Sequence, residues 1–354
     1  MAETGFFNYL ADKRFVPDVV LDFSKGNDKA LIISDFHMGA GKRDDLSENG
    51  DLLTGLLEKY YYKQNWHLIL NGDIEELQRY RLDTIEEKWK SLIELFHSFA
   101  GKNRLYKIVG NHDMILLYEK NYRFPLYNVV KINTNHLPAY VYHGHQASSL
   151  LYKYNHFVGA VLRYVLKPLG IKNISSARSP YKHFSVEKAA YKFSLENKCI
   201  SIIGHTHRPL FESLGRFEYI KFEIERLCRD YPSSSDGEKR RIETEVSALR
   251  GELGKLRRKE RRDVLRQSLY GDELSVPCLF NSGSAISKKG LTAIEFSGEE
   301  IALVYWFEEG KGRRFISRGG YNIEKLEGTP YCRAVLNHAN LDYISARINL
   351  LGSH

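Results

Sequence analysis

Five short motifs contain the side chains that could do chemistry, and each follows an apolar, β-rich run. In chain order they are Asp35-Phe36-His37, Gly72-Asp73, Gly110-Asn111-His112-Asp113, His143-Gly144-His145 and Gly204-His205-Thr206-His207. A strand that ends in a carboxylate, amide or imidazole delivers that group to the carboxyl edge of a sheet, where open α/β folds place their ligand sites. The order of these motifs therefore predicts that all five converge on one sheet edge and build a two-metal site there.

The candidate ligands offer oxygen and nitrogen atoms and include no thiolate. They are Asp35, His37, Asp73, Asn111, His143, His205 and His207. This donor set suits Mn, Fe, Co or Zn better than Ca or Mg alone. Two such ions about 3.5–4 Å apart can hold a bridging hydroxide and clamp a phosphoryl group for in-line attack. We therefore expect two divalent metal ions as cofactors, with Mn, Fe or Zn as the favoured metals.

Other residues have expected supporting roles. Asp35 and His37 would share one face of an extended strand. His112 could donate a proton to the leaving oxygen, with Asp113 behind it. For two further positions two readings stay open. His145 is a hydrogen-bonding neighbour or a further ligand, and Arg208 touches phosphate or simply forms a turn.

The elements that must position these residues follow from hydrophobic spacing. Apolar runs predict strands over 30–33, 67–70, 105–109, 139–142 and 200–203. The two 38-residue intervals from Asp35 to Asp73 and from Asp73 to Asn111 each fit a βαβ unit. Apolar residues at helical spacing predict helices, and alternating runs predict an edge strand and a hairpin. The helices are expected over 46–62, 84–99, 186–197 and 334–350, the edge strand within 16–23, and the hairpin over 291–307.

We expect a single domain, 1–354, that carries two insertions. Residues 146–199 are predicted to form a helical cap over the site, in which Arg178 could bind an anion or simply face solvent. Residues 221–268 are predicted to form a basic helical hairpin, with a heptad seam at Ile242, Val246, Leu249, Leu253 and Leu256. Between 238 and 266 there are 11 Lys or Arg residues against 6 Asp or Glu residues. The hairpin is either a solvated helix pair or a surface for nucleic acid, an anionic membrane or a second subunit.

The composition of the chain limits its expected partners and its expected location in the cell. The chain has 354 residues, a formal net charge of +8 and a pI of about 9.0, which favours anionic partners. Its four cysteines are far apart and indicate reduced thiols of a cytosolic protein. No N-terminal signal pattern is present, and no apolar run reaches the roughly 18 residues that a membrane span needs. The expected location is the cytoplasm, with the apolar segment 157–171 as a candidate for lying on a membrane surface.

The motif series resembles that of the calcineurin-like metallophosphoesterase superfamily: D-x-H, G-D, G-N-H-D, a single His, then G-H-x-H. The resemblance covers roughly 30–210, and the strands from Asn281 to Trp306 would match the second sheet of the family. It implies an α/β fold, an αββα sandwich of two packed β-sheets with helices outside. It also implies two metal ligand sets, with His112 as the phosphate-facing acid and Asp113 as its partner. The sets would be Asp35, His37, Asp73 and His207 for one ion, and Asp73, Asn111, His143 and His205 for the other. Glu76 matches a position that is frequently acidic in the family, and it is either a partner of the site or a helix N-terminal charge.

Within the superfamily the sequence looks most similar to the UDP-2,3-diacylglucosamine pyrophosphohydrolase group, which carries a cap at the position of 146–199. That group typically has Arg after the Asn of its third motif, whereas this chain has His112. The expected function is hydrolysis of a phosphate ester or pyrophosphate, with a phosphorylated small molecule or a lipid-linked nucleotide as substrate. The alternatives are a phosphodiesterase acting on nucleic acid or nucleotides, and a non-catalytic scaffold. An assembly role for 221–268, with a homo-oligomer, also stays open.

Overall fold

The computed structural model describes residues 17–147, 180–211, 231–267 and 276–351, together with 224 and 227–228. Residues 26, 42–43, 235, 288, 313–315 and 317–320, which fall within these ranges, lie outside the description. By its internal contacts the chain forms two compact units. One unit is built from 1–211 and 278–354, and the other from 212–277. The first unit contains both sheets and all five motifs.

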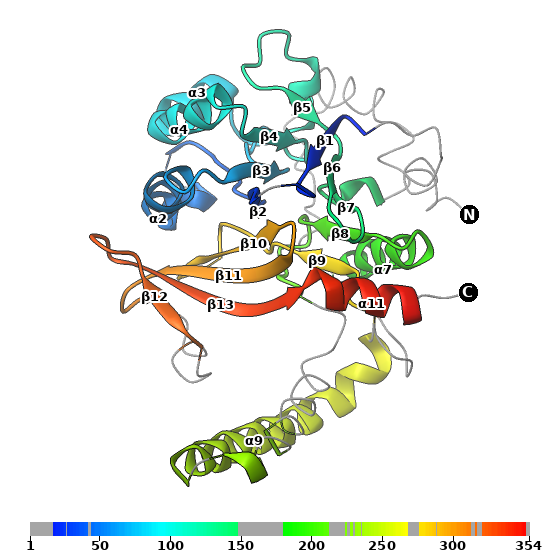
Figure 1. The fold of residues 1–354 in the computed structure, drawn as a ribbon. Coiled ribbons are helices and arrows are strands. Elements are labelled where there is room, and N and C mark those ends of the chain that lie inside the picture. The colour runs from blue at the N-terminus through cyan, green and yellow to red at the C-terminus, as the bar shows by residue number, and fades with distance from the viewer. Residues whose placement is uncertain are drawn as a thin grey trace. The chain divides into compact units, whose positions relative to one another are not determined.

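An eight-stranded sheet carries the first three motifs (Figure 1). Its order is β12-β13-β11-β10-β2-β3-β4-β5. The parallel part consists of β2 (Lys29–Ile33), β3 (His67–Asn71), β4 (Leu105–Ile108) and β5 (Leu126–Tyr127). The antiparallel part consists of β10 (Leu291–Ser297), β11 (Glu300–Glu308), β13 (Tyr331–Asn340) and β12 (Ile323–Lys325). Because β2, β3 and β4 are parallel neighbours, the loops that follow them start from the same edge.

A five-stranded sheet carries the last two motifs. Its order is β1-β6-β7-β8-β9, and β7, β8 and β9 are parallel. The strands are β1 (Val19–Asp22), β6 (Val130–Asn133), β7 (Ala139–Val141), β8 (Ile200–Ile203) and β9 (Leu279–Asn281). His143 follows β7 and His205 follows β8. The side chains of the five motifs therefore follow strands of two different sheets, and the expectation of a single sheet edge is wrong.

The two sheets pack together and helices cover their outer faces, so the predicted α/β sandwich is confirmed (Figure 1). Leu31 and Ile33 of β2 belong to a core cluster with residues of the helices α2 (Gly50–Leu56) and α4 (Lys90–Gly101). Ile32 alternates to the opposite face and is also fully buried. On the five-stranded sheet, α7 (Pro180–Glu196) packs through Val186, Ala190 and Phe193 against the core. A strand that is buried on both faces reads as a continuous apolar run, which is why these strands could be predicted.

The predicted helix over 84–99 is interrupted. It forms α3 (Leu82–Lys88) and α4, with a break at Trp89, where φ is −100° and ψ is 26°. The indole Nε1 of Trp89 donates to the carbonyl of Gly39 and to Oδ2 of Asp44, both at 3.0 Å. This tertiary contact accounts for the break. The helix predicted over 46–62 is likewise divided, into η2 (Asp45–Glu48), α2 and the π-helical η3 (Leu57–Tyr62).

Two expectations about the C-terminal part are wrong. The first ten residues of the 331–351 region form β13, and only α11 (Leu341–Leu351) is helical. Cys332 and Ala334 alternate as buried residues along β13, which pairs with β11. The strands between 281 and 306 do not make up one second sheet either. Phe280 pairs with Ile202 in the five-stranded sheet, whereas Ile294 pairs with Ile32 in the eight-stranded sheet.

The second unit contains the long helix α9 (Asp236–Gln267). The heptad positions Ile242, Val246, Leu249 and Leu253 are partly buried, and most residues between them are exposed. Most of the shorter arm, 221–230, lies outside the described residues, so the hairpin stays a prediction. The same holds for the cap, because 148–179 also lie outside them. All four cysteines are free thiols, and within the described ranges no helix is both long and apolar enough to cross a bilayer.

Candidate metal centre

Backbone hydrogen bonds continue past the ends of the strands and fasten the first two motif loops together. The amide of Asp35 donates to the carbonyl of Gly72, and the amide of His37 donates to the carbonyl of Asp73, both at 3.0 Å. The loops therefore keep the parallel register of β2 and β3, and their side chains reach the same region.

Other hydrogen bonds join the two sheets at this place. The amide of His205 donates to Oδ2 of Asp35 at 3.1 Å. The imidazole Nδ1 of His143 lies 2.7 Å from the carbonyl of Asn71 at the end of β3. The amide of Gly204 donates to the carbonyl of His143 at 3.0 Å, which ties the last two motifs to each other. The amide of His112 also donates to Oδ1 of Asp73 at 2.7 Å, so all five motifs belong to one hydrogen-bonded assembly.

Five of the seven predicted ligands have a left-handed backbone. The values of φ are 56° at Asp35, 46° at His37, 54° at Asp73, 64° at His205 and 55° at His207. A non-glycine residue in this region costs about 1–3 kcal/mol and persists only where its surroundings hold it. Such strain gathers at functional sites, so its coincidence with the predicted ligands marks this place as the site.

Asp35, His37 and His207 form the first cluster, in which their ligand atoms all lie within 4.8 Å of one another. Oδ1 of Asp35 is 3.0 Å from Nε2 of His207 and 3.9 Å from Nε2 of His37, and the two Nε2 atoms are 3.2 Å apart. Oδ2 of Asp35 accepts from the hydroxyl of Ser34 at 2.5 Å, so one oxygen is anchored and the other faces the cluster. Strand β2 ends at Ile33, and Asp35 and His37 meet through a turn. The expectation that they share a strand face is wrong.

Asp73, His143 and His205 form the second cluster, again within 4.8 Å. Oδ2 of Asp73 is 3.1 Å from Nε2 of His143. Its other oxygen accepts from the amide of His112 at 2.7 Å, which brings the third motif, and with it Asn111, to this cluster. A Cβ atom at Gly110 would lie 2.2 Å from Oδ1 of Asp73, so only glycine allows this approach.

Three of the predicted ligand atoms are buried and lack a hydrogen-bond partner in the part of the chain that the structure describes. They are Oδ1 of Asp35, Oδ1 of Asn111 and Nε2 of His143, of which the first and the last lie against other candidate ligand atoms. A buried polar atom without a partner costs roughly 1–3 kcal/mol and calls for an explanation such as an ion. The donor set is carboxylate, amide and imidazole, which transition-metal ions accept. The residues of these clusters therefore fit divalent cations.

Glu76 is a partner of the site rather than a helix N-terminal charge. Its Oε2 lies 2.9 Å from Nδ1 of His112 and 3.2 Å from Nδ1 of His37. Burial alone would raise the pKa of Glu76, but the hydrogen bonds from these two imidazoles lower it to about 2. A carboxylate that holds Nδ1 of a ligating histidine leaves Nε2 directed at the metal. Sequence reasoning placed Glu76 near the site and could not decide its role.

His112 is held as a protonated imidazole. Burial would lower its pKa, but Asp73 and Glu76 outweigh burial and raise the pKa to about 9. Its Nε2 lies 4.0 Å from Oδ2 of Asp73. The expected pairing of His112 with Asp113 is not found. The carboxylate of Asp113 instead accepts from the amides of Gly110 at 2.6 Å and Ile74 at 2.8 Å, and so fixes the two loops.

Lys107 is the most unexpected charged group behind the site. It belongs to β4, is 1% exposed, forms an ion pair with Glu75 and lies 3.8 Å from Oδ2 of Asp113. The hydroxyl of Tyr122 donates to the other carboxylate oxygen of Glu75 at 2.8 Å. Sequence reasoning missed this group, because a lysine within a strand ordinarily faces solvent.

The remaining candidates do not join the clusters. Arg208 donates to the carboxylate of Glu187, with Nε at 3.3 Å, and Arg178 lies outside the described residues. His145 is buried, and its ring centre is 5.4 Å from that of His143. Burial, with His143 and His205 adding to it, holds the pKa of His145 well below its usual value. His145 is therefore a neutral neighbour of the second cluster.

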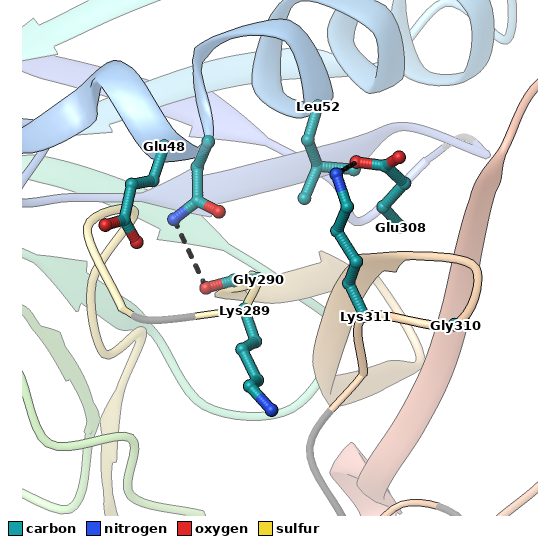
Figure 2. A pocket seen from close by; sticks show the side chains of 8 residues that line it. Glu48, Leu52, Lys289, Gly290, Glu308, Gly310 and Lys311 are labelled. Atoms are coloured by element: carbon teal, nitrogen blue, oxygen red, sulfur yellow. Dashed lines mark hydrogen bonds and ion pairs between the residues drawn. The ribbon is translucent and has the colours of Figure 1, made fainter.

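The described cavities lie away from both clusters. Figure 2 shows one of about 430 Å³ that is lined by Leu52, Lys289 and Gly290 among others. There Lys311 forms an ion pair with Glu308 at 2.6 Å, and Nδ2 of Asn49 donates to the carbonyl of Gly290. A second cavity, of about 480 Å³, is lined by the segment that follows Glu76 and by Ile115 and Glu119. None of the seven predicted ligands lines either cavity.

We expect metal binding to release protons at neutral pH. Burial would lower the pKa of His143, but Asp73 outweighs burial and raises the pKa to about 9, so the metal-free imidazole is protonated. A metal ion must displace that proton. Affinity for Mn²⁺ should therefore rise with pH up to about 9, by up to roughly tenfold per pH unit for each displaced proton. Calorimetry at pH 7 in two buffers of different ionisation enthalpy measures the release. Equal apparent enthalpies in both buffers, with constant affinity between pH 6 and 8, would contradict this expectation.

Comparisons with known proteins add similarities to solved structures only. No protein-family model matches the chain, and no curated protein sequence matches it. YfcE, a phosphoesterase from E. coli, is 10% identical, with 88% of this chain and 99% of YfcE covered and a TM-score of 0.35.

Two other solved structures give similar values. A conserved uncharacterised protein from Streptococcus pneumoniae TIGR4, predicted to be a phosphoesterase, is 12% identical over 80% of this chain and 91% of that chain, with a TM-score of 0.29. Vacuolar Protein Sorting 29 from Cryptosporidium parvum is 13% identical over 81% and 94%, with a TM-score of 0.33. Because all three TM-scores lie below 0.5, these similarities support no conclusion about activity.

Proposed function

We propose that the chain is a metal-dependent phosphoesterase that hydrolyses a phosphate ester or pyrophosphate bond. The observation that carries the proposal is the convergence of the motif side chains in two metal-fitting clusters, in which buried ligand atoms lie against one another. The order of the five motifs, which resembles the calcineurin-like metallophosphoesterases, supports it independently.

In this proposal Asp35, His37 and His207 hold one ion, and Asn111, His143 and His205 hold the other, with Asp73 shared between the two ions. The bound ions would supply an activated water for in-line attack on phosphorus and would stabilise charge on the phosphoryl oxygens.

His112 is the acid of this proposal. In the metal-free chain Asp73 and Glu76 raise the pKa of His112, and Glu76 on Nδ1 leaves Nε2 to donate a proton to the leaving oxygen. Ser34 and the amide of His205 hold Asp35 in one orientation, so its free oxygen need not reorganise when the substrate binds.

Two substrate classes follow from different features. The resemblance to the UDP-2,3-diacylglucosamine pyrophosphohydrolase group favours a lipid-linked nucleotide. The excess of basic residues in α9 favours a nucleic acid or nucleotide phosphodiester. We propose the first as substrate and keep the second as the alternative. The third reading is a scaffold without catalysis. It is disfavoured because all seven candidate ligands and His112 are present.

The test is a turnover assay with a metal analysis on the same preparation. We expect about two divalent ions per chain and hydrolysis of an aryl phosphate that chelation stops and added Mn²⁺ restores. A panel of nucleoside diphosphate lipids, cyclic nucleotides, bisphosphates and oligonucleotides then identifies the substrate class. Salt-sensitive oligonucleotide cleavage selects the alternative. Bound metal without turnover on any substrate selects the scaffold, and a chain that binds no metal contradicts the proposal.

A further inference from the structure

A buried carboxylate on α7 is bonded to the loop that carries the last two imidazoles. Glu187 is fully buried. Its Oε1 accepts from the hydroxyl of Thr206 at 2.9 Å and from Nε of Arg208 at 3.3 Å, and its Oε2 accepts from Nη2 of Arg208. These partners alternate along the chain with the predicted ligands His205 and His207. The carboxylate therefore holds the loop at two points, one on each side of His207.

A second side chain holds the same loop from β9. Nδ2 of Asn281 donates to the hydroxyl of Thr206 at 2.8 Å and to the carbonyl of Gly204 at 3.1 Å. A threonine hydroxyl has one proton to donate. Because Thr206 accepts from Asn281, its proton is directed at Glu187, and the three groups form a chain with one direction.

The loop needs such support. His205 and His207 both have a left-handed backbone, with φ of 64° and 55°, and each such residue costs about 1–3 kcal/mol when it is not glycine. These two conformations direct one imidazole into each cluster. Without these contacts the loop would relax to backbone conformations of lower energy, and both imidazoles would move out of the clusters.

Docking of α7 does not itself require this carboxylate. The apolar side chains Val186, Ala190 and Phe193 pack on Tyr142 and Ile203 in the core of the five-stranded sheet. A buried charge is costly unless it is paired, and the partners of Glu187 come from the ligand loop. The charge of Glu187 therefore stabilises the ligand loop, whereas the apolar face of α7 is sufficient to pack the helix on the sheet.

We infer that Glu187 is a positioning residue for the metal ligands His205 and His207, acting through Thr206 and Arg208. This inference rests on the proposed metal site. It couples α7, which ends the segment predicted as the cap, to both metal positions. Weakening the link should therefore weaken both ions together.

The test measures Co²⁺ binding to metal-free protein, by affinity and by the visible spectrum of the bound ion. Glu187→Gln keeps the shape of the side chain and removes its charge. We expect its affinity to fall by roughly 10- to 100-fold at both positions, as for other groups that orient ligands, together with a changed spectrum. Thr206→Val is the second variant, and it should shift affinity in the same direction. The two effects should not add, because the groups form one chain.

Ser194→Ala is the matched control on the same helix. The hydroxyl of Ser194 is buried and bonds that of Ser201 at 2.6 Å, away from the ligand loop. The control should lose stability but keep wild-type affinity and spectrum. Unchanged Co²⁺ binding in both Glu187→Gln and Thr206→Val would overturn the inference and leave the metal site intact. A wild-type chain that binds no Co²⁺ overturns the proposed metal site, and the positioning role with it.

Discussion

Asp73→Asn should reduce hydrolysis of an aryl phosphate by a factor on the order of 10³ or more while the chain stays folded. Metal ions contribute several kcal/mol of transition-state stabilisation, and each 1.36 kcal/mol is tenfold in rate. Asp73 is 1% exposed and lies 3.1 Å from Nε2 of His143. Its other oxygen accepts from the amide of His112. Loss of this one charge therefore affects metal binding at the second cluster and the placement of the acid.

Stability and metal content separate this effect from unfolding. Burial would raise the pKa of Asp73, but His143 and His112 outweigh burial and hold the pKa well below its usual value. In the wild type the carboxylate thus offsets the charge of these imidazoles. The metal-free variant should unfold at a lower urea concentration than the wild type, yet in a single cooperative transition. The surface variant Asp51→Asn, on the exposed side of α2, is the control and should keep both activity and metal. Wild-type turnover in Asp73→Asn would exclude the proposed mechanism.

The sequence was sufficient to predict the strands and the convergence of the candidate ligands, because both depend on local patterns. The runs before Asp35, Asp73 and His205 are largely apolar, and β2, β3 and β8 begin within one residue of their predicted starts. The order of the motifs then predicted where the site lies, because a parallel strand places the residue that follows it at the carboxyl edge of the sheet.

What the sequence did not give depends on contacts between distant residues. The break at Trp89 comes from its bonds to Gly39 and Asp44. The strand conformation of β13 comes from its pairing with β11, to which no spacing within 331–340 points clearly. No local pattern marks Glu187, and two readings stay open for Glu76, because the loops that these carboxylates hold are distant in sequence. The left-handed turns at the ligands follow from tertiary constraint, because local preference disfavours them.

Lys107→Met should lower the free energy of unfolding by about 3–5 kcal/mol, the usual cost of removing one partner of a buried ion pair. Methionine fills nearly the same volume, so the loss is chiefly electrostatic. The change leaves the carboxylates of Glu75 and Asp113 buried without a cation, since Lys107 is within ion-pair distance of both. Asp113 fixes Gly110 and Ile74, so the third motif should loosen as well.

Urea unfolding at two pH values tests the electrostatic cause. Burial raises the pKa of Asp113 to about 6, even with Lys107 opposing it. A carboxyl group whose pKa is higher in the folded than in the unfolded chain destabilises the fold as pH rises through that interval, and protonation removes the cost. The deficit of Lys107→Met should therefore be smaller at pH 5 than at pH 8. Adding Glu75→Gln should recover part of it, since the second change removes an unpaired charge. The control is Lys102→Met, which loses only an exposed contact with the ring of Tyr62 and should cost about 1 kcal/mol or less. If Lys107→Met costs no more than this control at both pH values, the buried cation does not stabilise the loops of the metal centre.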